Sequence, residues 1–99
     1  MQGRIATEGV SIYTSEPFGV TTTPDGSVWF TEARECQIGR RMPNGKIFEY
    51  RLPTPESYPT VITVGPDGAL WFVELLADKI GRFDPVKLTF TEFPLPGKE

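Results

Sequence analysis

The sequence predicts an all-β protein built from two copies of one unit, and three observations predict it. Residues 17–32 recur with little change 42 residues later, at 59–74. The 99 residues are 38% hydrophobic and 12% aromatic, which is enough for a packed core. Ten Gly and ten Pro recur at fixed places, as in a chain of short strands and tight turns. A period in the forties built from such segments is typical of a β-propeller or a similar array.

The first unit divides into four strands separated by turns. Its second strand, Val28-Trp29-Phe30-Thr31-Glu32, is dense in residues with high strand propensity. Pro24-Asp25-Gly26 and Pro43-Asn44-Gly45 read as turns, because Pro presets φ at about −65° and Gly accepts a positive φ. The expected strands are residues 18–23, 28–32, 38–41 and 46–52.

The second unit repeats this order, since Ile80-Gly81-Arg82 corresponds to Ile38-Gly39-Arg40. The segment before the first unit has the pattern of a fourth strand, with Gly3-Arg4-Ile5 lying 42 residues before Gly45-Lys46-Ile47. We therefore expect two four-stranded propeller blades and one extra N-terminal strand. Residues 1–16 are expected to form an outer strand of a preceding or neighbouring blade, residues 17–58 blade 1, and residues 59–99 blade 2. The first of these either pairs with the edge of another chain or remains from a divided blade.

Composition excludes several classes of function. The net charge is −3 and Lys and Arg are scattered singly, so we expect no nucleic-acid partner. No apolar run approaches the roughly 20 residues that span a bilayer, and the N-terminus lacks the apolar core of a signal peptide. We therefore expect no membrane partner and a cytoplasmic location. The single cysteine, Cys36, is expected to be a small filler. The chain contains no histidine, which excludes Ser-His-Asp and Cys-His catalysis within one chain.

The central strand of each unit is apolar on both faces. Side chains alternate along a strand, so Trp29 points to one face while Val28 and Phe30 point to the other. A sheet that is apolar on both faces must be covered on both. Propellers close with about 4–8 blades, so two blades leave an apolar flank at each end. We therefore expect homo-oligomerisation into a head-to-tail ring, as a trimer or a tetramer of two-blade chains.

Two carboxylates are the candidate site residues. Glu32 and Glu74 each end the second strand of a unit, at the rim where Phe18 and Thr60 begin the first strands and form a candidate ligand face. Carboxylates on one rim could act as a general base or bind a cation, and oxygen ligands alone suit Mg²⁺ or Ca²⁺. The alternatives are a solvated strand end or a carboxylate that caps backbone N–H groups.

The repeat also resembles a known family. Ile62-Thr63-Val64-Gly65-Pro66-Asp67-Gly68-Ala69-Leu70-Trp71-Phe72-Val73-Glu74, followed by Lys79-Ile80-Gly81-Arg82 and Glu92-Phe93-Pro94-Leu95-Pro96, resembles a blade of virginiamycin B lyase, or streptogramin B lyase. The resemblance covers essentially the whole chain. It implies a seven-bladed propeller that linearises cyclic streptogramin B antibiotics by elimination at their ester linkage, without water and aided by Mg²⁺.

The resemblance does not extend to the catalytic residues. In the family's scheme, a His within a Pro-His-Gly segment works with a Glu shortly after Trp-Phe. Phe18 and Thr60 occupy the histidine position in this chain, and neither transfers a proton near neutral pH. Glu32, Glu35 and Glu74 lie near the acidic position, where without a histidine they could at most hold a cation.

These observations leave two main functions. The first is a virginiamycin B lyase-like two-blade module that is non-catalytic in itself, assembles into a ring, and presents a face to a small molecule or a protein. The second is a fragment of a Mg-dependent streptogramin B lyase or lactonase-like enzyme that uses Glu32 and Glu74 with a divalent metal. A third possibility is that the chain is a structural remnant without a ligand. The first is favoured because the structural repeat is intact while the histidine is missing.

Overall fold

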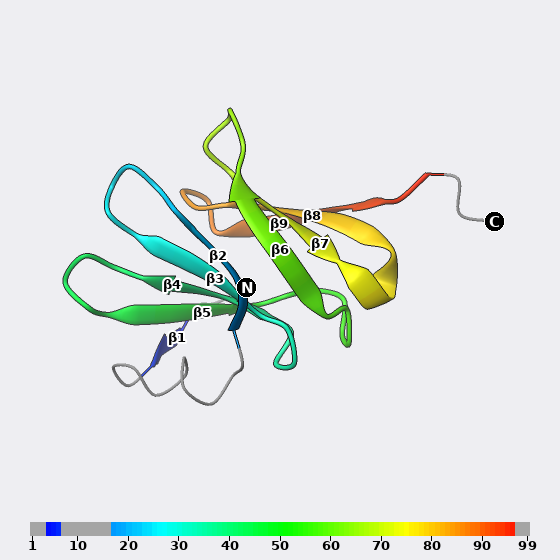
Figure 1. Ribbon diagram of the computed structural model, residues 1–99, viewed down its shortest axis with the longest axis horizontal. Helices are drawn as coiled ribbons and strands as arrows, with labels where there is room; N and C mark the ends of the chain where they lie inside the picture. Colours follow the sequence, from blue (N-terminus) through cyan, green and yellow to red (C-terminus); the bar gives the residue numbers. More distant parts are fainter. Residues whose placement is uncertain (1–3, 7–16, 97–99) are drawn as a thin grey trace.

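The computed structural model describes residues 4–6 and 17–96, which form two antiparallel sheets (Figure 1). The strand orders are β1-β5-β4-β3-β2 and β6-β7-β8-β9. The strands are β1 (Arg4–Ala6), β2 (Pro17–Thr22), β3 (Val28–Glu32), β4 (Gln37–Arg41), β5 (Ile47–Arg51), β6 (Pro59–Val64), β7 (Leu70–Glu74), β8 (Lys79–Asp84) and β9 (Thr89–Pro94). Within the described part, the only helix is the short 3-10 helix η1 (Leu75–Ala77). The predicted all-β class is confirmed.

The hairpin turns adopt the conformations that their residues predict. Gly26 and Gly45 have φ of 90° and 92°, where an L side chain is strained. Asp25 reinforces the first turn, because its carboxylate accepts the N–H of Ser27 at 2.9 Å. The turns therefore fix the strand register that places the side chains discussed below.

Each sheet has two distinct faces, which we call the tryptophan face and the phenylalanine face. Trp29 and Trp71 mark the first, and Phe30 and Phe72 the second. Phe30 lies opposite Gly39 and Phe72 opposite Gly81. A Cβ on either glycine would lie 2.2 or 2.1 Å from the ring of the opposing phenylalanine, so the ring occupies the space of the missing side chain. The four strands of each unit thus repeat in register as well as in sequence.

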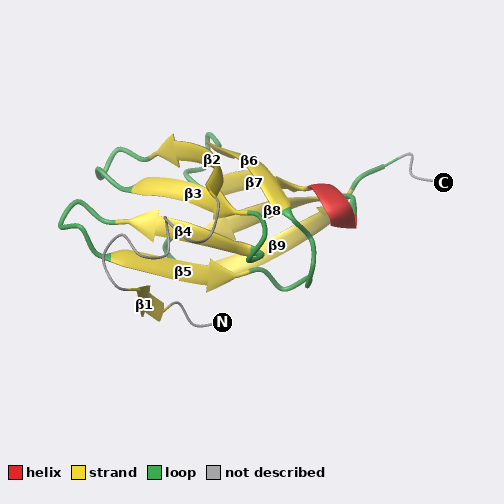
Figure 2. Cartoon of the chain, turned by 60° about the horizontal axis from the view of Figure 1, so that its bottom comes forward, coloured by secondary structure: helices red, strands yellow, loops and turns green. Residues whose placement is uncertain are grey.

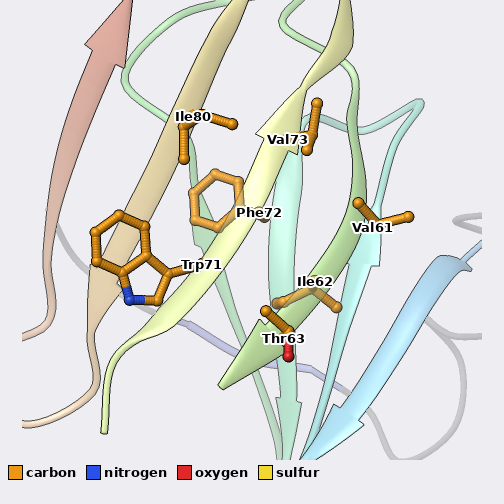
Figure 3. Close-up of a pocket in the computed structure, with 7 residues that line it drawn as sticks. All are labelled: Val61, Ile62, Thr63, Trp71, Phe72, Val73 and Ile80. Atoms are coloured by element: carbon orange, nitrogen blue, oxygen red, sulfur yellow. The ribbon is translucent and has the colours of Figure 1, made fainter. Parts of the chain in front are cut away.

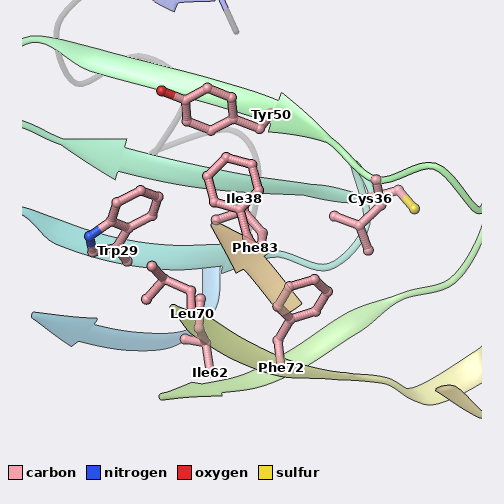
Figure 4. Close-up of a cluster of buried hydrophobic side chains, with 9 residues drawn as sticks. Trp29, Cys36, Ile38, Tyr50, Ile62, Leu70, Phe72 and Phe83 are labelled. Atoms are coloured by element: carbon pink, nitrogen blue, oxygen red, sulfur yellow. The ribbon is translucent and has the colours of Figure 1, made fainter. Parts of the chain in front are cut away.

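The core forms where the tryptophan face of the first sheet meets the phenylalanine face of the second (Figure 4). The Phe83 ring centroid lies 5.8 Å from that of Trp29 and 4.9 Å from that of Tyr50. Leu70 and Phe72 lie in the same buried cluster. Each such side chain contributes about 1.5–3 kcal/mol through burial, so this contact is the main source of stability between the sheets.

The two sheets approach most closely at their innermost strands, β2 and β6, which lie side by side (Figures 1 and 2). A Cβ on Gly19 would lie 2.9 Å from the carbonyl oxygen of Thr60, so only glycine fits there. The hydroxyl of Thr31 accepts the N–H of Gly19 at 2.9 Å and donates to the Thr60 carbonyl. This hydroxyl therefore joins two strands that belong to different sheets.

The extra N-terminal strand is described only at residues 4–6. These residues pair antiparallel with β5 of the same chain, with Arg4 opposite Glu49 and Ala6 opposite Ile47. In its described part the strand therefore extends the first sheet of its own chain, whereas the sequence left open pairing with another chain's edge or a remnant of a divided blade. Residues 1–3, 7–16 and 97–99 lie outside the described residues, so the three divisions at 1–16, 17–58 and 59–99 stay predictions.

Replacing Thr31 with Val tests the bridge between the innermost strands. The substitution keeps the shape of the side chain but leaves the Gly19 N–H and the Thr60 carbonyl without their shared partner. We expect the free energy of unfolding to fall by about 1–3 kcal/mol in urea denaturation. Thr31→Ser retains the hydroxyl, so its free energy of unfolding should fall clearly less. Equal decreases in the two variants would contradict the bridge.

Candidate functional site

Glu32 and Glu74 occupy equivalent positions in the two sheets. Glu32 lies opposite Pro17 and Gln37, and Glu74 lies opposite Pro59 and Lys79. Both glutamate side chains are fully buried. The solvated strand end, one of the two alternatives that the sequence left, is therefore wrong. A buried carboxyl group requires hydrogen bonds or a proton, so its neighbours determine what it can do.

The carboxylate of Glu32 is held by an amide. The side-chain nitrogen of Gln37 donates to Oε1 of Glu32 at 2.6 Å, and Gln37 is itself buried. An amide donor stabilises the carboxylate without supplying a mobile proton. This arrangement is typical of a carboxylate that holds neighbouring strands in place.

The carboxyl group of Glu74 has a second carboxyl group beside it, that of Glu92. Thr54, in the connection between the sheets, donates its hydroxyl to Glu92 at 2.8 Å. The Lys79 ammonium donates to the Thr54 hydroxyl at 3.1 Å and lies 3.5 Å from Glu92. The two oxygens of Glu74 are buried and meet no donor among the described residues while both carboxyl groups are ionised. When Glu74 carries a proton, its carboxyl group can donate a hydrogen bond to Glu92, and the two buried carboxyl groups become partners.

The surroundings move the pKa values of the two carboxyl groups apart. Burial, followed by the hydrogen bond and the charge of Glu92, raises the pKa of Glu74 to about 8. Burial also acts to raise the pKa of Glu92, but hydrogen bonds from Glu74 and Thr54 together with the Lys79 ammonium outweigh it and lower the value. The two groups therefore hold one proton between them near neutral pH.

Glu49 and Glu92 are site residues that the sequence analysis did not select. They lie opposite Gly39 and Gly81, so they share the phenylalanine face with Glu32 and Glu74 respectively. Glu49 is almost fully buried. Their correspondence in the repeat was visible, but only the strand pairing shows that each lies on the same face as its rim glutamate.

The structure does not bring Glu32 and Glu74 together in one site. Each lies on the phenylalanine face of its own sheet, and the second sheet's phenylalanine face packs against the first sheet. The first sheet therefore lies between the two glutamates.

The described residues do not supply a full set of ligands for the predicted cation site. Across residues 4–6 and 17–96, no group of three or more His, Cys, Asp or Glu side chains is arranged to hold a metal ion. The Gln37 amide donates to Glu32, and the Lys79 ammonium lies beside Glu92, the neighbour of Glu74; neither nitrogen is a metal ligand. The described residues therefore do not fit Mg²⁺ or Ca²⁺ at either glutamate.

The remaining candidate residues lie in different surroundings. Phe18 is 57% exposed, whereas Thr60 is buried between the sheets. The ligand face expected at these two residues stays a prediction. Glu35 is exposed and lines an open hollow of about 510 Å³ together with Arg34 and Arg51. It is separate from the buried carboxyl groups.

The match to a known family decides the classification. The model of the virginiamycin B lyase family matches residues 1–99, the whole chain. The chain belongs to the virginiamycin B lyase family. The resemblance seen in the repeat is thereby confirmed, and the two stacked sheets are propeller blades.

Individual relatives support the assignment. Virginiamycin B lyase from Bordetella pertussis is 44% identical over 43 residues, which cover 43% of this chain and 14% of that protein. The structure of selenomethionine-substituted virginiamycin B lyase from Staphylococcus aureus superposes with a TM-score of 0.83 at 33% identity, covering 97% of this chain and 32% of that one. The structure of a catalytically inactive histidine-to-alanine variant of virginiamycin B lyase from the same organism, with quinupristin, superposes with a TM-score of 0.80 at 42% identity. This match covers 85% of this chain and 28% of that one.

This family member thus spans about a third of the length of its solved relatives, 28% and 32% in the two comparisons. No helix of its described part is long and apolar enough to cross a membrane.

Replacing Glu74 with Gln tests the shared proton. The pKa of Glu74 rises from its ordinary 4.5 to about 8 on folding, so the stability that its proton supplies is complete below about pH 4.5 and is lost as the pH rises through 8. The amide of Gln can still donate to Glu92 but does not ionise. We expect Glu74→Gln to flatten the pH dependence of the thermal midpoint between pH 5 and 9 and to add on the order of 1–3 kcal/mol at pH 9.

The exposed Glu35 provides the control, since Glu35→Gln makes the same substitution away from the carboxyl pair and should leave the pH dependence as in the parent chain. A Glu74→Gln variant with the parent's pH dependence would show that Glu74 carries no proton in the folded chain.

Proposed function

We propose that this chain is a two-blade module of a virginiamycin B lyase-like propeller that is non-catalytic in itself. It completes its propeller with further copies of the same chain and presents the rim of the resulting ring to a small molecule or a protein. The module is proposed to act in the cytoplasm, without a nucleic-acid or membrane partner. The observation that carries the non-catalytic assignment is the chemistry of the rim.

The rim has no histidine to transfer a proton near neutral pH. The chain has no histidine, and a histidine-to-alanine variant of the Staphylococcus aureus relative is catalytically inactive. Glu74, whose pKa is near neutral, is fully buried and faces Glu92. A general base must reach the proton that it removes, and this carboxyl group is enclosed between two blades. It therefore supports the blade junction.

The ring is supported by the apolar flank of the second blade. The tryptophan face of the first blade is covered, and Trp29 is fully buried. The equivalent face of the second blade leaves Val61 57% and Phe93 42% exposed. Apolar surface that is contiguous and rimmed by polar residues marks a site of protein contact. A trimer or a tetramer of two-blade chains would cover every such flank within the usual range of propeller sizes.

Turnover separates this proposal from the enzymatic alternative, the Mg-dependent lyase or lactonase-like fragment. We expect the purified chain, incubated with quinupristin and Mg²⁺ and followed by mass spectrometry, to leave the antibiotic cyclic. We also expect Mg²⁺, Ca²⁺ and EDTA to leave the melting midpoint unchanged, since the described residues offer no set of metal ligands. Steady linearisation of the antibiotic would overturn the non-catalytic assignment, and a metal-dependent midpoint would restore the cation site.

Mass in solution tests the assembly. Sedimentation at micromolar concentration should give three or four times the mass of one 99-residue chain. A well-folded monomer at all concentrations would contradict the ring and would favour blades supplied by a longer chain.

A further inference from the structure

The connection between the two blades, residues 52–58, covers the thiol of Cys36. The Leu52 N–H donates to the Cys36 carbonyl at 3.0 Å, and the Cys36 thiol donates to the Thr54 carbonyl at 3.3 Å. The sulfur also lies 3.0 Å from the Ser57 hydroxyl. Cys36 sits at the edge of the buried cluster (Figure 4) and is 8% exposed. We call this connection the strap, because it is fastened across the thiol.

On the side of blade 2, one threonine side chain attaches the strap. The Thr54 hydroxyl donates to Glu92 at 2.8 Å and accepts a hydrogen bond from the Lys79 ammonium at 3.1 Å. Two backbone N–H groups of η1 also donate to the carbonyls of the last two residues of the strap. The side-chain attachment to blade 2 therefore passes through Glu92, the partner of Glu74.

Two features make the strap easier to open than the strands on either side of it. Glu56 and Tyr58 both have φ of 57°, in the left-handed region where a residue other than glycine is strained. Pro53 and Pro55 have no N–H to contribute to a hydrogen-bond ladder. Opening therefore releases strain that the closed strap holds.

The carboxyl pair beside the strap needs either a proton or water. Glu74 is fully buried, and both of its oxygens and Oε2 of Glu92 meet no donor among the described residues while the two groups are ionised. A proton on Glu74 removes one charge and supplies one donor. Two enclosed carboxylates would instead require hydration. The surrounding strands are held by their ladders, so the strap is the segment whose movement can admit water.

Few titratable groups surround Glu74. The charged groups that act on it are Glu92 on β9 and Lys79 on β8. The strap and β6 contribute Thr54 and Pro59, which do not titrate. On the other face of β7 lies a hollow of about 160 Å³ (Figure 3), and the described residues that line it include no titratable side chain.

The facing blade adds two titratable side chains to the buried cluster, Cys36 and Tyr50. Burial raises the pKa of Tyr50 above its ordinary 10, so this phenol stays neutral. The Cys36 thiol is a hydrogen-bond donor to the strap. The carboxyl pair is therefore the charged unit whose ionisation the strap encloses.

We propose that the strap is a pH-sensitive cover, which stays closed over Cys36 while Glu74 and Glu92 share a proton and opens when the pair loses that proton. On opening, Thr54 leaves Glu92, water reaches both carboxylates, and the thiol is exposed. The inference goes beyond the proposed ring and does not depend on it, because the strap lies within one chain.

The direction of the pH effect follows from the two states of Glu74. Its pKa is about 8 in the closed structure and 4.5, the ordinary value, once it is hydrated. Opening therefore releases a proton. It becomes more favourable as the pH rises between these two values, and it gains nothing further above about pH 8.

Cys36 is the single cysteine, so its reaction with dithiodipyridine measures the open fraction. The rate is divided by that of the same chain unfolded in urea at the same pH, which cancels the ionisation of the thiol itself. We expect this ratio to rise by up to about tenfold per pH unit between pH 5 and 8 and then to level off. A low, non-denaturing urea concentration should leave the ratio unchanged, because local opening exposes little surface.

Matched variants assign the effect to the pair and to the strap. Glu74→Gln keeps a donor for Glu92 but does not ionise, so its ratio should be constant across this pH range. Glu35→Gln, at an exposed position, should follow the parent chain. Thr54→Val removes the attaching hydroxyl and should raise the ratio at pH 5 by about tenfold, whereas Thr54→Ser should stay near the parent. Circular dichroism confirms that each chain is folded at each pH.

Each contrary result identifies the step that fails. A parent ratio that does not change with pH contradicts the strap, even where the ring forms. A Glu74→Gln ratio that rises as in the parent contradicts control by the carboxyl pair. A ratio that rises steeply with low urea shows that the thiol is reached by global unfolding, which contradicts local opening. Equal ratios for Thr54→Val and Thr54→Ser contradict the attachment through the hydroxyl.

Discussion

The structure depends on one constraint: a sheet that is apolar on both faces must be covered on both. The chain meets this requirement where the tryptophan face of blade 1 receives Phe83, Leu70 and Phe72 of blade 2. That contact buries Trp29, fixes the relation of the two blades, and encloses the carboxyl groups of Glu74 and Glu92. The tryptophan face of blade 2 has the same pattern of residues, and no described sheet covers it, which is the basis of the proposed assembly.

The enclosed carboxyl groups show how one scaffold position can change its chemistry. In blade 1 the rim glutamate accepts an amide hydrogen from Gln37, whereas in blade 2 Lys79 takes the corresponding place. The Lys79 ammonium lies 3.5 Å from Glu92 and helps to keep that carboxyl group ionised, which leaves Glu74 to hold the proton. The rim therefore uses its glutamates to join strands and blades.

Much of the fold could be predicted from the sequence because the repeat carries local signals. Turn residues such as Gly26 and alternating β-formers such as Val28-Trp29-Phe30 act over a few residues, and the strands lie where these signals place them. The site was harder to predict. The burial of Glu74 and its contact with Glu92 depend on strand pairing and on the packing of one sheet on another. The identity of a residue in the sequence does not reveal either of these long-range arrangements. The same holds for Thr60, whose burial follows from the close approach of β2 and β6 at Gly19.

The most direct test of the central claim is the environment of Trp71. In a Trp29→Phe chain, Trp71 is the only indole, and its fluorescence reports whether the flank of blade 2 is covered. The account predicts that, as the protein concentration rises, the emission shifts to shorter wavelength and acrylamide quenching falls. Emission that stays solvent-exposed and fully quenchable in a folded chain at every concentration would contradict it.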